Sequence, residues 1–198
     1  MNNYEYIIAS LPEFGKDSGI LDAGVLTGFI LSQCSPSDAS LVQLVIDGCS
    51  DRERLDKAFY ERALGSRNTF IREYFRFDLM VRNTKVEYLN HALGRPEATD
   101  IMPMPGTEDN GFEDSYDFEE KPSVMAVLEQ TDILERERGM DRLMWGKAEE
   151  LTSLHLFDLD MILAFVTKLM ISDRWNRLDP ETGRRMFRTL VQEIRNTR

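Results

Sequence analysis

Apolar residues recur along most of this chain at the three- and four-residue spacing of an amphipathic helix, and strand-type alternation is nearly absent. The longest such pattern runs over Ser66–Leu93 without a glycine or proline, and Gly94 follows where a glycine cap belongs. An earlier pattern covers Leu21–Gln33, and Ser35-Pro36 then supplies a cap and a first-turn proline for the next helix. Ser50–Glu53 is typical of a capping box and predicts the start of a further helix.

The C-terminal half continues the helical pattern and contains the most apolar segment of the chain, Leu159–Ile171. Because this segment is hydrophobic nearly all round, we expect it to form a helix in the middle of the packing. Asp158 can cap that helix, and Asp179-Pro180-Glu181 would begin a last one. We therefore predict an all-α protein, a single helical domain over residues 1–198, folded as an irregular bundle of about seven to eight helices.

A strongly acidic stretch interrupts the helical pattern between Glu97 and Lys121. The chain has a net charge of −11, and this stretch holds nine acidic residues and one lysine, a balance of −8, which leaves −3 for the remainder. Two prolines in Met102–Gly106 prevent a helix there. We predict a mobile acidic loop over residues 95–122. The alternative is a short docking segment that uses the aromatic residues Phe112, Tyr116 and Phe118.

Composition points to a cytoplasmic protein. The apolar content of 42% and the charged content of 30% are typical of a soluble globular chain. The apolar segment would reach about 20 Å as a helix, contains Asp160 and Lys168, and is shorter than the roughly 20 residues that a bilayer needs. No signal peptide is visible, and Cys34 and Cys49 are expected to be free thiols. No basic, aromatic-interleaved face emerges, so we do not expect a nucleic-acid partner.

Three residues at the start of the apolar segment could carry chemistry: His155, Asp158 and Asp160. One helical turn would place His155 and Asp158 together, with Asp160 turned away. Such a set could form a metal or acid/base site, but a metal site needs further ligands and no partner histidine is nearby. We favour Asp158 as a helix cap. The sequence therefore predicts no catalytic residue, no metal and no cofactor.

Polar residues also interrupt the apolar pattern of the long helix, and these are Arg76, Asp78, Arg82 and Asn83. Asp78 and Arg82 are spaced i, i+4 and can pair on the helix surface. If the helix is buried on several sides, these groups must bond one another or polar groups of neighbouring helices. A structural network is the favoured interpretation, and a strip that faces a partner is the alternative.

Arg174 and Trp175 follow the apolar segment and complete the set of candidate interface residues. Arginine and tryptophan are both enriched in protein interfaces. A tryptophan that plugs the end of a helical bundle is the more common arrangement. Both interpretations stay open at this point.

Three stretches of the chain together carry a family resemblance: Tyr4–Pro12, Phe75–Asn83 and Phe157–Phe165 with Arg174-Trp175 following. They resemble a little-characterised bacterial family associated with V-type ATP synthases, whose members look like a shortened relative of the C-type subunit, known as d-type in eukaryotes. The resemblance implies a noncatalytic, all-helical subunit between the membrane rotor ring and the central stalk. It transfers no ligand-binding residue. By pattern alone, Tyr4–Pro12 could begin as a strand or as a helix.

Three functional hypotheses follow. The leading one is a noncatalytic coupling or accessory subunit of a V-type ATPase or ATP synthase, with other subunits of the rotor ring and central stalk as partners. Such a protein would be cytoplasmic and would reach the inner membrane only through the complex. The second is a cytoplasmic helical adaptor that docks a basic protein through the acidic-aromatic loop. The third is a hydrolase or metalloprotein that uses His155, Asp158 and Asp160.

Overall fold

The computed structural model describes residues 4–14, 21–50, 55–105 and 118–177. Throughout these ranges the regular structure is helical, as the spacing of apolar residues predicted, and no strand is present in them. The described ranges contain eight helices: α1 (Tyr4–Ser10), α2 (Ala23–Gln33), α3 (Pro36–Ser50), α4 (Lys57–Leu64), α5 (Thr69–Leu93), α6 (Lys121–Leu128), α7 (Ile133–Leu151) and α8 (Leu159–Arg177). The chain is therefore an all-α multi-helix bundle, and its opening stretch is a helix.

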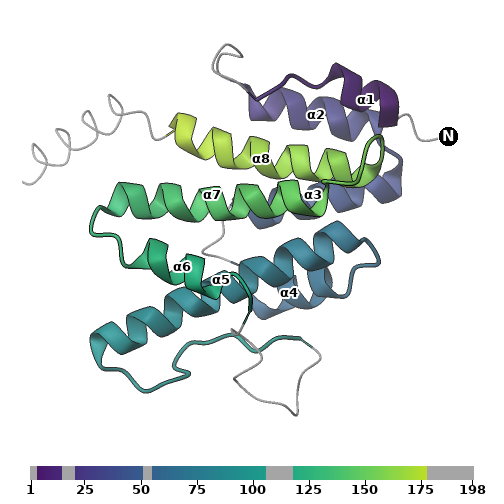
Figure 1. The fold of residues 1–198 in the computed structure, drawn as a ribbon. Helices are drawn as coiled ribbons and strands as arrows, with labels where there is room; N and C mark the ends of the chain where they lie inside the picture. The colour runs from purple at the N-terminus through teal and green to yellow at the C-terminus, as the bar shows by residue number, and fades with distance from the viewer. Residues whose placement is uncertain (1–3, 15–20, 51–54, 106–117, 178–198) are drawn as a thin grey trace, which may run out of the picture.

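Helix α8 lies in the middle of the bundle (Figure 1). It packs against α1, α2 and α3 on one side and against α5 and α7 on the other. Its buried residues point in all directions around the helix, which is the arrangement that the apolar segment predicted. They are Ile162, Leu163, Ala164, Phe165, Val166, Thr167, Leu169 and Ile171.

The long helix also forms as predicted. Asn68 caps α5 by accepting a hydrogen bond of 2.9 Å from the Ile71 N–H. Gly94 ends the helix with a φ of 63°, a left-handed conformation that glycine adopts without a steric penalty. The helical spacing of apolar residues thus predicted this helix, which begins three residues later than expected, and Gly94 predicted its end.

The predicted capping box at Ser50–Glu53 is wrong as a helix start. Helix α3 continues through Ser50, whose hydroxyl donates 2.7 Å back to the Ile46 carbonyl instead of capping a new helix. Asp56 caps α4 by accepting from the Phe59 N–H at 2.8 Å. Two further predictions, the cap at Asp179-Pro180-Glu181 and the last helix after it, lie outside the described residues.

The N-terminal end of the predicted acidic loop is held along α5. Asn83 is fully buried; its Nδ2 donates to the Met102 carbonyl at 2.7 Å, and its Oδ1 accepts from the Met102 N–H at 3.1 Å. Further along the helix, Asn90 donates to the Thr99 carbonyl at 2.7 Å. Residues 95–105 are therefore attached to the bundle, although their sequence alone predicted a mobile loop.

The C-terminal end of the same loop is held as well. The Phe118 ring lies 5.9 Å from the Phe77 ring, edge to face, and Glu120 accepts a hydrogen bond of 2.7 Å from Lys147 on α7. Helix α6 then begins at Lys121, slightly earlier than the helical patterning predicted. Residues 106–117, which include Phe112 and Tyr116, lie outside the described part of the chain.

No helix in the described ranges combines the length and the apolar character that a membrane crossing requires.

Candidate functional site

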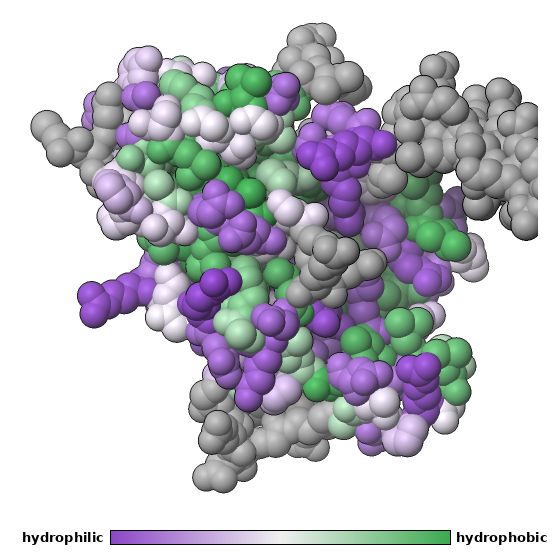
Figure 2. Space-filling view, turned by 180° about the vertical axis from the view of Figure 1, so that it is seen from behind, coloured by the Kyte–Doolittle hydropathy of each residue, from purple (hydrophilic) through white to green (hydrophobic). Residues whose placement is uncertain are grey.

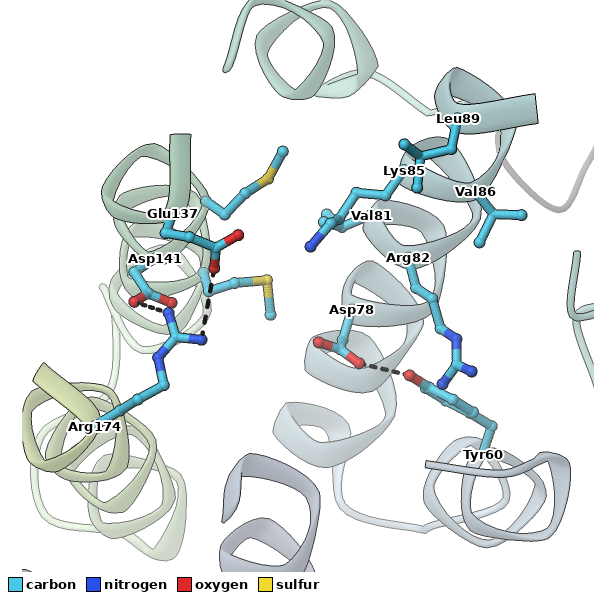
Figure 3. A pocket seen from close by; sticks show the side chains of 12 residues that line it. Tyr60, Asp78, Val81, Arg82, Lys85, Val86, Leu89, Glu137, Asp141 and Arg174 are labelled. Atoms are coloured by element: carbon cyan, nitrogen blue, oxygen red, sulfur yellow. Dashed lines mark hydrogen bonds and ion pairs between the residues drawn. The ribbon is translucent and has the colours of Figure 1, made fainter. Parts of the chain in front are cut away.

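An open pocket of about 440 Å³ lies between α5 and α7 (Figure 3). Its walls come from two pairs of consecutive helices, α4 with α5 and α7 with α8, and it carries three carboxylates and three cationic side chains around an apolar floor. The lining residues are Tyr60 from α4, Asp78, Val81, Arg82, Lys85, Val86 and Leu89 from α5, Glu137, Met140, Asp141 and Met144 from α7, and Arg174 from α8.

The inner end of the pocket is closed by polar contacts between α4 and α5. The Tyr60 hydroxyl donates 2.7 Å to Asp78 Oδ2, and both side chains are buried. Burial first, and then the adjacent Asp78 charge, raise the pKa of the Tyr60 hydroxyl, so it stays protonated and able to donate. Arg82 donates 2.6 Å to the Leu55 carbonyl, which ties α5 to the start of α4.

The opposite wall is organised around Asp141. This buried carboxylate accepts one hydrogen bond from Arg174 Nη2 and another, of 2.6 Å, from Trp175 Nε1, and both donors lie on α8. Glu137, one turn earlier on α7, lies 3.9 Å from Arg174 Nη1. A buried carboxylate with a charged donor and an indole donor fixes the register of α7 against α8.

The outer end of the pocket combines one cation with apolar side chains. Lys85 points from α5 across the pocket toward the α7 wall, with Val86 and Leu89 near it (Figure 3). Within the described residues, no hydrogen bond or ion pair engages its ammonium group. Met140 and Met144 from α7 supply flexible apolar surface at the floor.

A second, shallower groove of about 410 Å³ lies on the other side of Asp141. Trp145 and Trp175 line it together with Arg138 and Arg142. The Arg138 guanidinium lies 5.5 Å from the centre of the Trp175 ring, within the range of a cation–π contact. Trp175 is thus partly buried and bonded to the bundle, while one edge of it borders this groove.

Three of the six candidate interface residues meet in the first pocket, namely Asp78, Arg82 and Arg174. Trp175 lines the second groove. Asn83 turns away to hold Met102. Arg76 lies on the exposed face of α5, 3.7 Å from Glu73. Their role in an interface stays a prediction.

The prediction that Asp78 and Arg82 lie on the helix surface needs correction, because Asp78 is buried. Asp78 is bonded to Tyr60, and Arg82 reaches the Leu55 carbonyl. Helix α4 covers this side of α5, which the spacing of two residues within α5 could not reveal. These contacts support the interpretation of the polar residues as a structural network.

His155, Asp158 and Asp160 do come together, and they do so at the start of α8. Asp158 caps the helix, accepting 3.2 Å from the Met161 N–H, and its other oxygen lies 2.5 Å from His155 Nδ1. Asp160 lies 4.0 Å from the same nitrogen, so it is not turned away as predicted; it also accepts 2.5 Å from Asn68 Nδ2. Across the part of the chain that the structure describes, no group of three or more His, Cys, Asp or Glu side chains is placed to hold a metal ion.

Sequence reasoning missed the four other polar residues of the pocket, namely Tyr60, Lys85, Glu137 and Asp141. One signal was present for Asp141. It lies one turn after Glu137, and Met140 and Met144 flank it on the same apolar stripe of α7. A carboxylate on a buried stripe requires donors from another element, which a search for interrupted stripes would have found.

Comparison with known proteins shows a family and no individual relative. No curated protein matches the chain, and no solved structure matches it. The model of a family described as "Protein of unknown function (DUF2764)" matches residues 26–197, which include every helix that lines the two pockets. The chain therefore belongs to the DUF2764 family.

Proposed function

We propose that this chain is a noncatalytic, protein-binding subunit of a V-type ATPase or ATP synthase, with a coupling or accessory role between the membrane rotor and the central stalk. The observation that carries the proposal is the make-up of the pocket between α5 and α7. Its floor is apolar and includes Met140 and Met144, and acidic and basic side chains surround this floor. An apolar centre with a polar rim is typical of protein–protein interfaces, in which methionine and arginine are enriched.

The family resemblance supplies the identity of the complex. Phe75–Asn83 lies within α5, which forms one wall of the pocket, and Phe157–Phe165 leads into α8, whose Arg174 lines the pocket at its end. Two of the three stretches thus belong to helices that build this pocket. Their buried residues make the walls rigid, which suits a subunit that transmits force through its contacts.

Affinity capture of the intact complex tests the proposal. The chain is tagged in its own host, the membranes are solubilised gently, and the co-purified proteins are identified by mass spectrometry. We expect catalytic and stalk subunits of the V-type complex in stoichiometric amounts. An assembled complex that lacks this chain, while the chain is expressed and folded, would contradict the proposal.

Matched variants refine the same measurement. Leu89→Glu places a charge at the exposed outer end of the pocket, whereas Val25→Glu changes an exposed apolar residue of α2. We expect Leu89→Glu to reduce capture and Val25→Glu to leave it unchanged. Equal capture by both variants would contradict a role of the pocket in binding the complex.

A deletion distinguishes this proposal from the acidic-loop adaptor. Because Met102 and Phe118 anchor the two ends of the loop, removal of residues 107–116 leaves the anchoring contacts in place. We expect capture of the complex to survive this deletion. Loss of capture, with the fold intact by circular dichroism, would favour an adaptor that uses the acidic segment instead.

A further inference from the structure

We propose that the pocket between α5 and α7 receives an α-helix of a partner protein, and that this helix presents an acidic side chain to Lys85 between apolar ones. The inference deepens the proposed function and rests on its protein-binding part, not on the identity of the complex. Three observations carry it: the helical spacing of the pocket walls, the exposed apolar residues beyond the outer end, and the position of Lys85.

The walls of the pocket have the geometry of a helix bundle with one position open. On α5 the lining residues Val81, Lys85 and Leu89 recur every fourth residue, and on α7 Glu137, Met140 and Met144 follow the same helical spacing. The two helices run in opposite directions side by side (Figure 1). The groove between two packed helices is where a third helix inserts its side chains.

Exposed apolar residues extend both walls past the outer end of the pocket. Leu89 and Leu93 are one turn apart on α5, and Ile133 and Leu134 lie one turn before Glu137 on α7; each of the four is at least 49% exposed. They account for four of the nine large exposed hydrophobic residues in the described ranges. From Asp78 to Leu93 the α5 wall measures about 22 Å, enough for about four turns of a bound helix. Figure 2 shows hydrophobic side chains on this side of the molecule, where α5 ends and α7 begins.

The charged residues of the pocket indicate which side chain the bound helix must carry. Asp78 is bonded to Tyr60, Arg82 to the Leu55 carbonyl, and Asp141 to Arg174 and Trp175, so these groups are engaged within the fold. Lys85 is half-buried, points into the pocket, and has no hydrogen-bond or ion-pair partner among the described residues. Glu137 on the facing wall lies 3.9 Å from Arg174 and forms no ion pair with Lys85. A partner helix with an acidic side chain at this position would pair with Lys85, whereas one without it would bury the ammonium group without an ion-pair partner.

Photo-crosslinking in the intact host identifies the occupant. Benzoylphenylalanine is introduced in place of Leu89 in the full-length chain, and in place of Val25 on α2 as the control. After irradiation, we expect position 89 to crosslink to a helical segment of another protein with an acidic residue within its apolar stripe. A crosslink to residues 178–198 of the same chain, to a second copy, to lipid or to an extended segment would overturn the proposal, as would no crosslink.

Charge reversal tests the pairing itself. Lys85→Glu should weaken co-purification of the crosslinked protein by about tenfold, and a lysine in place of the partner's acidic residue should restore it. Lys57→Glu is the matched control, since Lys57 is an exposed lysine of α4 outside the pocket. Unchanged capture by Lys85→Glu, with the native circular dichroism spectrum and Tm retained, would overturn the pairing.

The outcomes separate this inference from the proposed function. A crosslinked acidic helix from a protein outside the V-type complex would support the inference and contradict the identity of the complex. Co-purification of the V-type subunits without a crosslink at position 89 would support the complex and overturn the inference.

Discussion

Individual buried polar residues tie the helices of this protein to one another. Asn83 bonds the Met102 backbone at both its N–H and its carbonyl, Asp78 accepts from Tyr60, and Asp141 accepts from Arg174 and Trp175. Each contact joins elements that are separate in sequence. A buried donor or acceptor left without its partner loses the full free energy of its hydration, so each of these pairs specifies one arrangement of the helices.

The carboxylate of Asp141 is expected to matter most among the acidic residues of α7. Asp141→Asn keeps one acceptor oxygen for the two α8 donors, both of which bond Oδ2, but removes the negative charge that pairs with Arg174. We expect a loss of about 1–3 kcal/mol in the free energy of unfolding, measured by urea denaturation. Glu135→Gln is the control in the same helix, because Glu135 pairs with Arg138 on the surface. For this variant we expect the free energy of unfolding to fall by less than about 1 kcal/mol. Equal losses would show that Asp141 is not the centre of this contact.

His155 gives the stability of the α8 start a pH dependence. The hydrogen bond with Asp158 raises the pKa of His155 above its ordinary value of 6.5, against a smaller opposing effect of burial. Because the folded state holds this proton more tightly, the contribution is complete below the ordinary pKa and is lost as the pH rises through the raised one. We expect His155→Gln to lower the Tm more at about pH 5.5 than at about pH 8.5. If His155→Gln lowers the Tm with the same pH dependence in an Asp158→Asn background, the hydrogen bond with Asp158 is not the cause of that pH dependence.

At the scale of the elements, the type of each helix and the end of α5 followed from local pattern, but the end of α3 and the packing between helices did not. The stripes of α5 and α8 predicted these helices well because hydrophobic periodicity is a short-range property. The capping box at Ser50 failed because α3 runs on through that residue, and residues 95–105 were expected to be mobile although Asn83 and Asn90 hold them. In both places, contacts with another element decided the local conformation.

The close contact between α6 and α7 depends on a glycine, Gly139, which has no side chain to keep the two helices apart. A Cβ added at Gly139 would lie 2.6 Å from Val127 Cγ1, whereas one added at Gly146 in the same helix would meet nothing within 4 Å. We expect Gly139→Ala to destabilise the protein by about 1–2 kcal/mol through overpacking. Gly146→Ala should be neutral or stabilising by up to about 1 kcal/mol, since alanine favours the helix.

Two measurements complete this comparison. Urea denaturation of the two variants gives the difference directly, and Val127→Ala added to Gly139→Ala should recover part of the loss by making room for the new methyl group. No recovery would mean that the loss arises from something other than the Val127 contact.

At the scale of the whole molecule, α8 connects the two sides of the bundle. It packs against α1, α2 and α3 as well as α5 and α7, so a cavity at its centre weakens the entire fold. We expect Leu169→Ala, at a fully buried position, to cost about 2–5 kcal/mol and to shift a single unfolding transition seen by circular dichroism and tryptophan fluorescence.

An exposed leucine provides the contrast. Leu154 lies in the connection between α7 and α8 and is 94% exposed, so Leu154→Ala should change the free energy of unfolding by less than about 0.5 kcal/mol. Two separate transitions in Leu169→Ala would indicate that the sides of the bundle unfold independently, contrary to the central role of α8.

The amino-acid sequence by itself determined that this chain is helical, where its long helix ends, and that Leu159–Ile171 lies in the middle, because periodicity, caps and glycine act over a few residues. It also indicated Asp78, Arg82 and Arg174 as candidate interface residues, but not that they lie close together in the fold. Only the tertiary structure decided that they share a pocket, and that Tyr60 and Asp141 are the partners of Asp78 and Arg174. These contacts span 18 and 33 residues of sequence, a separation across which no local pattern carries information.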